Sequence, residues 1–253
     1  MPKKIHFFYI IINLVFIFLL YPIKIFAFHV VIDPGHGGSD TGATRADFRE
    51  SDLTLKLGLK IQSLMLENFP DIQISLTRVE DLNLTLEQRV DLAQKSKADL
   101  FISLHANSSP AKYVSGMEFY FKKGLNTDPA ITLLENIRSQ KNINISNDIS
   151  KRQQDVVKTI TSDLIDWGQT KQSLSFNKIL QNHAQMSKSL IKRAPFFVIE
   201  NLAIPSVLIE IGYITNLSES KKLFSDEYQI QIAHSIVRSI NDFKLKFYSS
   251  ESK

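Results

Sequence analysis

Four residues of this chain have the types and the surroundings that metal-dependent hydrolysis requires: His36, Glu50, His105 and Glu210. Each lies where an expected strand gives way to a turn, among small or turn-forming residues such as those of Pro34-Gly35-His36-Gly37-Gly38. Two imidazoles and one carboxylate make a three-ligand set for zinc, and a second carboxylate can then act on the water that zinc activates. The pattern predicts a metal-dependent hydrolase.

Each of these residues also has a structural explanation when it is considered alone. His36 could be incidental to a glycine-rich turn, and Glu50 could stabilise the N-terminus of the helix that follows it. His105 could be a hydrogen-bonded histidine at the end of an apolar strand. Glu210 stands in an apolar segment, so its carboxylate must be ion-paired, perturbed in pKa or metal-bound, and Arg193 is a possible ion-pair partner.

Other catalytic signatures are missing from the sequence. The chain has no cysteine, which excludes disulfides, thiolate zinc sites and a cysteine nucleophile. Neither H-E-x-x-H nor G-x-S-x-G occurs, so a thermolysin-like helix site and a serine-esterase elbow are excluded. Asn107, two residues after His105, could orient an imidazole or a substrate, or could form an Asx turn.

The first 27 residues have the features of a secretory signal peptide. A basic start precedes an apolar run from Phe7 to Tyr21, and Ala27 supplies a small residue for cleavage. The alternative is an uncleaved signal anchor, because the run is only slightly short for a membrane span. Removal of residues 1–27 leaves 226 residues without a membrane span, and the net charge falls from +4 to +1. This charge gives no electrostatic case for nucleic-acid binding.

The rest of the chain alternates short apolar strands with amphipathic helices. Helices are expected at 51–68, after the Thr85 capping box, and twice within 218–247; strands are expected at 29–33, 72–77, 99–105, 116–121, 196–199 and 205–211. This alternation predicts an α/β domain over residues 28–248, a twisted sheet with helices on both faces, followed by a polar tail at 249–253. Ligands of such sheets bind beyond the carboxyl ends of the strands, where His36 and His105 would lie.

Residues 122–173 depart from this alternation. The stretch is polar and shows no convincing strand, but apolar residues recur at helical spacing in two places, ending with Ile160, Leu164 and Trp167. A structureless connection of this length is unusual in a compact domain. We expect a helical insertion that lies over the edge of the sheet or the mouth of the site.

Several segments together resemble the zinc-dependent N-acetylmuramoyl-L-alanine amidases known as amidase type 3. The resemblance extends from about Val30 to Phe247 and keeps the order of the family's motifs. The motifs are Val31-Ile32-Asp33-Pro34-Gly35-His36-Gly37-Gly38, Gly42-Ala43, Glu50, Ser103-Leu104-His105-Ala106-Asn107, Arg193-Ala194-Pro195-Phe196-Phe197-Val198, and Pro205 to Asn216. Tyr213 stands where the family usually has Phe, a minor departure.

The resemblance assigns roles to the candidate residues. It implies that His36, Glu50 and His105 bind Zn²⁺ and that Glu210 is the catalytic carboxylate. Asn107 and Arg193 are candidate supporting residues. It also implies a mixed, mainly parallel sheet. The implied reaction is hydrolysis of the amide between N-acetylmuramic acid and the L-alanine of the stem peptide of peptidoglycan. Zinc would polarise the carbonyl and acidify its water, while Glu210 would move the proton to the leaving amine.

The insertion resembles the regulatory helical region of the cell-division amidases. In those relatives a glutamate occupies the metal and blocks substrate, and Glu135-Asn136 falls at the matching place. Glu135 is therefore a candidate inhibitory ligand, unless it is an ordinary exposed glutamate on a solvated helix. The stripe of Ile160, Leu164 and Trp167 could bind a divisome activator of the LytM type, or could pack on its own domain.

The sequence thus predicts a monomeric, autoinhibited zinc amidase of the periplasm that separates daughter cells. Two alternatives stay open. One is a catalytically inactive scaffold that binds the cell wall and keeps the fold. The other is a zinc peptidase acting on a different amide, because the same metal chemistry serves both reactions.

Overall fold

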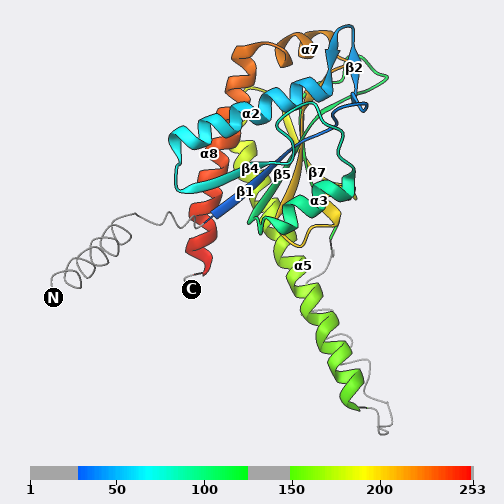
Figure 1. The fold of residues 1–253 in the computed structure, drawn as a ribbon, viewed down its shortest axis with the longest axis vertical. Coiled ribbons are helices and arrows are strands. Elements are labelled where there is room, and N and C mark those ends of the chain that lie inside the picture. Colours follow the sequence, from blue (N-terminus) through cyan, green and yellow to red (C-terminus); the bar gives the residue numbers. More distant parts are fainter. Residues whose placement is uncertain (1–27, 125–148, 252–253) are drawn as a thin grey trace, which may run out of the picture.

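A six-stranded mixed sheet forms the centre of the protein. The computed structural model describes residues 28–124 and 149–251 (Figure 1). The strands follow the order β4-β1-β5-β8-β6-β7, and only the β6–β8 pair is antiparallel. Their bounds are β1 Phe28–Pro34, β4 Ile72–Leu76, β5 Leu100–Asn107, β6 Met117–Phe121, β7 Ser189–Arg193 and β8 Ser206–Tyr213. A separate hairpin pairs β2 (Thr44–Arg45) with β3 (Phe48–Arg49).

Helices cover both faces of this sheet (Figure 1). One face carries α2 (Glu50–Asn68), α5 (Ile149–His183) and α8 (Asp226–Glu251), which contact one another through α8. The other face carries α3 (Leu86–Lys95) and the short α6 (Phe197–Glu200), and α7 (Leu217–Leu223) follows β8. The expected α/β class, the mainly parallel sheet and the two helical layers are all confirmed.

The alternation of side chains along the strands divides the core into two layers. Val30 and Ile32 of β1 pack with the residues that α2, α5 and α8 contribute, whereas Val31 points to the smaller layer under α3 and α6. The smaller layer contains nine buried residues and covers only part of its face. The uncovered part of that face therefore carries polar side chains, among them those of the candidate site.

Two expectations about local structure are wrong. Phe196–Ile199 was expected to be a strand, but Phe197–Glu200 is a helical turn, because a short apolar run does not distinguish the two states. The strand of this region is instead Ser189–Arg193, which sequence patterns miss because it is a half-exposed edge strand. Glu50 does not precede the helix but is its first residue.

The predicted insertion at 122–173 is described at its two ends, over 122–124 and from Ile149 onward. From there α5 runs past the predicted end at Ser173, and its final turns pack in the core through Phe176 and Leu180. Its first turns project away from the sheet (Figure 1). Glu135 lies outside the described residues. At the other end of the chain, α8 continues to Glu251, so most of the expected polar tail is helical.

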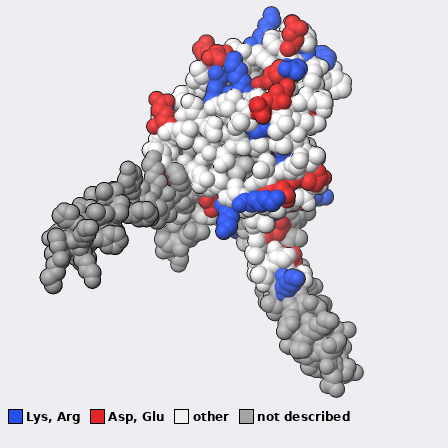
Figure 2. All heavy atoms as spheres, in the orientation of Figure 1, with Lys and Arg blue, Asp and Glu red and all other residues white. Residues whose placement is uncertain are grey.

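The described surface carries both signs of charge. On the face shown in Figure 2, Lys and Arg side chains lie interspersed with Asp and Glu. Within residues 28–124 and 149–251, no helix combines the length and the apolar character needed to cross a membrane. The signal peptide expected at residues 1–27 lies outside the described part of the chain.

Candidate metal centre

The topology brings His36, Glu50 and His105 together at the carboxyl ends of two neighbouring strands. Strands β1 and β5 pair in parallel with Pro34 opposite Leu104, so His36 follows β1 beside His105 in β5. Glu50 reaches the same point because the β2–β3 hairpin delivers it to the start of α2. Backbone hydrogen bonds from Glu50 to Ala43 and from Ser51 to Thr41 fix the end of that hairpin.

The ligand-type atoms of these three residues converge on one point. They all lie within 4.8 Å of one another. Glu50 Oε1 is 3.1 Å from His36 Nε2 and 2.9 Å from His105 Nδ1. The two imidazole rings meet edge to face with their centroids 4.9 Å apart. Two nitrogens and one carboxylate oxygen in this arrangement are a donor set that suits a divalent transition metal.

The close approach of the two ring nitrogens to the Glu50 oxygen requires protons or a cation between these atoms. Burial disfavours the charged His36 ring, but Glu50 and Asp40 outweigh this and raise its pKa to about 9. Burial likewise disfavours the charged Glu50, yet both imidazoles hold its pKa well below its usual value. A divalent cation could supply the charge that protons supply otherwise.

Two glycines leave the space that the imidazoles fill. A Cβ atom on Gly35 would lie 2.4 Å from His105 Cε1, and one on Gly42 would lie 2.6 Å from both Glu50 Oε2 and His36 Cδ2. Gly42 also has a φ of +62°, and His36 itself has a φ of 59°. A left-handed conformation at a non-glycine residue is costly and persists where the surroundings enforce it.

A shell of hydrogen bonds holds the three donors in place. His36 Nδ1 lies 2.8 Å from Asp40 Oδ2, which leaves Nε2 to face the cluster. The backbone N–H groups of Ala43 and Ala106 donate to the two oxygens of Glu50, at 2.8 and 2.9 Å. The donor set is therefore oriented by its surroundings and does not depend on its own contacts alone.

A buried arginine ties the His36 loop to the end of β1. Arg89 donates to Asp33 at 2.7 Å, to the Pro34 carbonyl at 2.8 Å and to the His36 carbonyl at 2.7 Å. Asp33 is fully buried and also accepts from Thr77 and Ser103. This network fixes the loop because removal of any one partner would leave buried polar groups unpaired.

Glu210 lies beside the cluster as a half-buried carboxylate whose Oε2 atom is buried and unpaired. It is the direct cross-strand partner of His105, so both side chains point to the same face of the sheet. Its Oε2 has no hydrogen-bond partner, and among the described residues it forms no ion pair. The alternative of an ion pair with Arg193 is thus not found; that guanidinium lies over the Phe121 ring. Burial raises the pKa of Glu210 to about 7, which suits proton transfer near neutral pH.

A buried carboxylate, that of Glu118, lies next to Glu210 on the same face. The two residues are opposite each other across the antiparallel β6–β8 pair. Asn107 donates to Glu118 at 3.1 Å and so supports this carboxylate. The expected alternative of an Asx turn is not found, because the Ser109 N–H donates to Thr215 instead. The Tyr213 hydroxyl donates to Glu118 at 2.9 Å.

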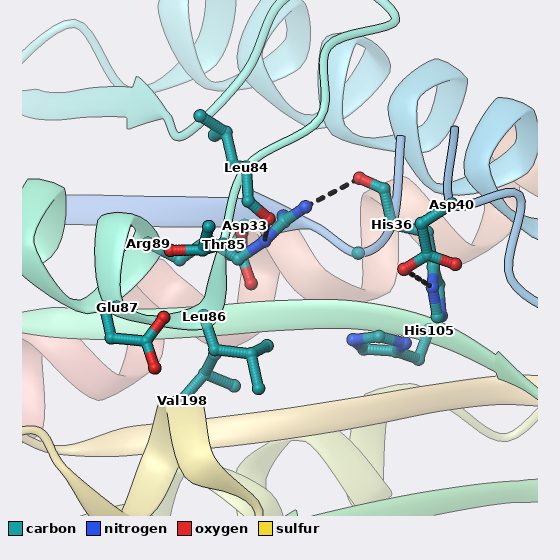
Figure 3. Close-up of a pocket in the computed structure, with 11 residues that line it drawn as sticks. Asp33, His36, Asp40, Leu84, Thr85, Leu86, Glu87, Arg89, His105 and Val198 are labelled. Carbon is teal, nitrogen blue, oxygen red and sulfur yellow. Dashed lines mark hydrogen bonds and ion pairs between the residues drawn. The ribbon is translucent and has the colours of Figure 1, made fainter. Parts of the chain in front are cut away.

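A cleft of about 370 Å³ opens on the other side of the histidines. Figure 3 shows His36, Asp40 and His105 at one end of this cleft, and Leu86 and Glu87 of α3 at the other. Val198 of α6 completes the wall. The cluster therefore lies between this cleft and the Glu210–Glu118 pair.

The sequence of this chain matches that of one protein family over most of its length. The profile of the amidase type 3 family, described as N-acetylmuramoyl-L-alanine amidase, matches residues 30–242. This chain belongs to that family. Among members of the amidase family, AmiC of Escherichia coli is 31% identical over 221 residues, which are 85% of this chain and 52% of AmiC. This chain thus spans about half the length of AmiC.

Solved structures of amidases share the fold. The catalytic domain of CwlV from Bacillus (Paenibacillus) polymyxa superposes with a TM-score of 0.63 at 27% identity, covering 85% of this chain and 97% of that domain. AmiC2 of Nostoc punctiforme gives a TM-score of 0.62 at 26% identity, covering 86% of this chain and 97% of that structure. These amidases confirm the family-level expectation from the sequence.

Sequence patterns missed two residues of this amidase site. Asp40 orients His36, but a lone aspartate in a Gly- and Ser-rich loop carries no signal. Glu118 had a usable signal, because it is a carboxylate within the apolar strand segment Met117–Phe121, the same argument that singled out Glu210.

Proposed function

We propose that this protein is a zinc-dependent N-acetylmuramoyl-L-alanine amidase. It would hydrolyse the amide that joins the lactyl group of N-acetylmuramic acid to the L-alanine of the stem peptide. The observation that carries the proposal is a three-donor cluster beside a carboxylate, Glu210, whose buried Oε2 has no hydrogen-bond partner, in a chain that matches the amidase family. The same donor set without such a carboxylate could hold a metal but would lack a group that moves the protons of hydrolysis.

The residues present fit zinc. His36, Glu50 and His105 would hold it, and three protein ligands leave a coordination position open, as catalytic zinc sites do. Zinc supplies a Lewis acid that polarises the carbonyl and acidifies water. Asp40 and the Ala43 and Ala106 N–H groups would keep the donors oriented during turnover.

Glu210 would act as the general base and then the general acid of the reaction. In the amide hydrolysis the attacking water loses a proton and the alanine nitrogen must gain one before it leaves. The Glu210 carboxylate would accept the first proton at its unpaired oxygen and donate it to the amine. Burial suits both steps, because a pKa raised to about 7 lets the group hold or release a proton near neutral pH.

The test uses residues 28–253 and purified cell wall. Wild type should bind one zinc ion and release stem peptides, and Glu210→Gln should keep the zinc and lose turnover. Mass spectrometry of the products should find free L-alanine amines and lactyl carboxylates. A wild-type protein that binds wall without releasing peptide would favour the inactive scaffold, and a cut elsewhere in the peptide would favour the zinc peptidase.

We also propose that the protein is exported to the periplasm and regulated during daughter-cell separation. Cleavage after Ala27 would release it, and Glu135 would block the metal until a LytM-type activator binds the insertion. Supporting this, Leu164 and Ile165 of α5 are 43% and 53% exposed, so apolar side chains of this helix are open to a partner. A variant lacking residues 126–172 should cleave wall faster than the intact mature chain; if it folds and does not, autoinhibition is refuted.

A further inference from the structure

The face of the sheet that bears Glu210 continues across β6 toward the edge strand β7. We call the polar surface on this part of the face the floor. His105, Glu210 and Glu118 are consecutive cross-strand partners on β5, β8 and β6. Side chains that are directly opposite one another point to the same face of a sheet. The floor next to Glu210 is therefore formed by Glu118 and by the residues that surround its carboxylate.

Glu118 gathers hydrogen-bond donors from four strands. It accepts from Asn107 of β5 at 3.1 Å, Tyr213 of β8 at 2.9 Å, Tyr120 of β6 at 2.5 Å and Lys192 of β7 at 2.5 Å. The Glu118 side chain is 8% exposed, whereas that of Lys192 is 40% exposed. The buried Glu118 carboxylate thus holds the Lys192 ammonium at the surface of the floor and sets the orientation of that ammonium.

The Lys192 ammonium has N–H donors left to bind a ligand. An ammonium has three N–H donors, and in the described part of the chain Glu118 is the only hydrogen-bond acceptor found for it. Lys192 also lies 5.8 Å from the centre of the Tyr120 ring, so aromatic and carboxylate contacts both restrain its side chain. A pre-oriented cation loses less entropy on binding an anion than a mobile surface lysine does.

The charge of the cleft on the opposite side is unfavourable for an anion. Its lining includes the carboxylates of Asp40 and Glu87, and its Arg89 is already paired with Asp33 (Figure 3). The cation of the cleft is therefore already bound to a carboxylate and to backbone carbonyls, whereas Lys192 on the other side has only Glu118 as a hydrogen-bond partner among the described residues. In the amidase substrate the sugar side of the scissile bond is uncharged, because the lactyl carboxyl is consumed in the amide, whereas the stem peptide carries carboxylates. Charge complementarity places the peptide over β6 and β7.

The reach of the floor matches the first carboxylate of that peptide. The residue after L-alanine is a glutamate joined through its γ-carboxyl, so its α-carboxylate is available. One peptide unit spans about 3.8 Å between Cα atoms, which puts this carboxylate about 7 Å from the scissile carbon. Strands β5, β8 and β6 are spaced by roughly 4.8 Å, so a scissile carbon midway between His105 and Glu210 would lie about 7 Å from Glu118, which binds the Lys192 ammonium.

Resting on the proposed amidase function, we infer that Lys192, positioned by Glu118, binds the α-carboxylate of the second stem-peptide residue. The site therefore distinguishes a free carboxylate from a carboxamide at that position. Loss of one charge-assisted hydrogen bond corresponds to a change of roughly 10-fold to 100-fold in binding.

Two matched muropeptides test this inference, one with a free α-carboxylate and one with a carboxamide on the second residue. The full mature chain should favour the carboxylate by about 10-fold in kcat/KM, chiefly through KM. Lys192→Met should remove that preference, and Lys192→Arg should keep part of it. Lys95→Met removes a charge from an exposed α3 lysine paired with Asp91, and it should leave the preference unchanged.

A binding measurement separates this inference from the proposed reaction. Calorimetric titration of the released stem peptide needs no turnover, and the carboxylate form should bind wild type about 10-fold more tightly than it binds Lys192→Met. Equal binding of both peptide forms by wild type, or an equal loss for both in Lys192→Met, would overturn the inference. Carboxylate-selective binding without cleavage would instead refute the amidase function alone.

Discussion

Substitution of Gly42 by alanine should damage the metal centre without removing any ligand. The Gly42 backbone has a φ of +62°, a left-handed conformation that costs an L-residue about 1–2 kcal/mol. The new methyl group would also lie 2.6 Å from Glu50 Oε2 and 2.6 Å from His36 Cδ2. Both contacts are shorter than real Cβ atoms tolerate, so the carboxylate and the imidazole have to move.

The expected loss of stability follows from the hydrogen bond that Glu50 loses when its carboxylate moves. Its Oε2 accepts a hydrogen bond from the Ala43 N–H at 2.8 Å, and such a bond to a charged group contributes about 1.5–3 kcal/mol. Together with the backbone strain, the free energy of unfolding of the metal-free protein should fall by about 2.5–5 kcal/mol. Zinc affinity should fall by about 10-fold to 100-fold, because the donors lose their alignment.

Gly168 offers a matched control within the same chain. A Cβ atom there meets nothing within 4 Å, and the residue lies inside α5. Gly168→Ala should therefore raise the free energy of unfolding by about 0.5–1 kcal/mol and leave zinc affinity unchanged. The assays are urea unfolding of the metal-free proteins and a competition titration of zinc against a chelator. A Gly42→Ala protein that matches wild type in both would refute the geometry described for the cluster.

Three further substitutions test other parts of the site. Burial raises the pKa of Glu210 from 4.5 to about 7, so this group favours folding below about pH 4.5 and loses that contribution as pH rises through 7. Metal-free Glu210→Gln should consequently gain up to about 3 kcal/mol over wild type between pH 4.5 and 8 in urea unfolding, and a constant difference would contradict the burial argument. Asp40→Asn should weaken zinc binding about 10-fold in a chelator titration through loss of control over His36, whereas unchanged affinity would deny Asp40 that role. Arg89→Met should destabilise the protein by about 3–5 kcal/mol because Asp33 stays buried without its cation, and a loss under 1 kcal/mol in thermal or urea unfolding would show that this network is dispensable.

Local patterns were sufficient for much of the fold and failed where burial was partial. The capping box at Thr85 and Gln88 forms as expected, because its hydrogen bonds are local. The strand Ser189–Arg193 was missed, because an edge strand buries little and shows weak alternation. The apolar run at Phe196–Ile199 was assigned the wrong state for a related reason: four residues are too few to show a period.

The sequence by itself determined which residue types were available for chemistry. It showed two histidines and two glutamates at expected turns, excluded thiol chemistry through the absence of cysteine, and carried the motifs of the family. It could not decide between ligand and structural roles for any one of them. Those alternatives depend on distances between segments that are far apart along the chain.

Tertiary structure alone decided how these residues combine. The parallel pairing of β1 with β5 places His36 near His105, and the pairing of β5 with β8 puts Glu210 on the same face. It also decided that Glu210 has no ion-pair partner among the described residues and that Glu118 gathers donors from four strands. The physical reason is that the charge, burial and hydrogen bonding of a side chain depend on all its neighbours in space. Strand order decides which residues are neighbours, and no local sequence pattern encodes strand order.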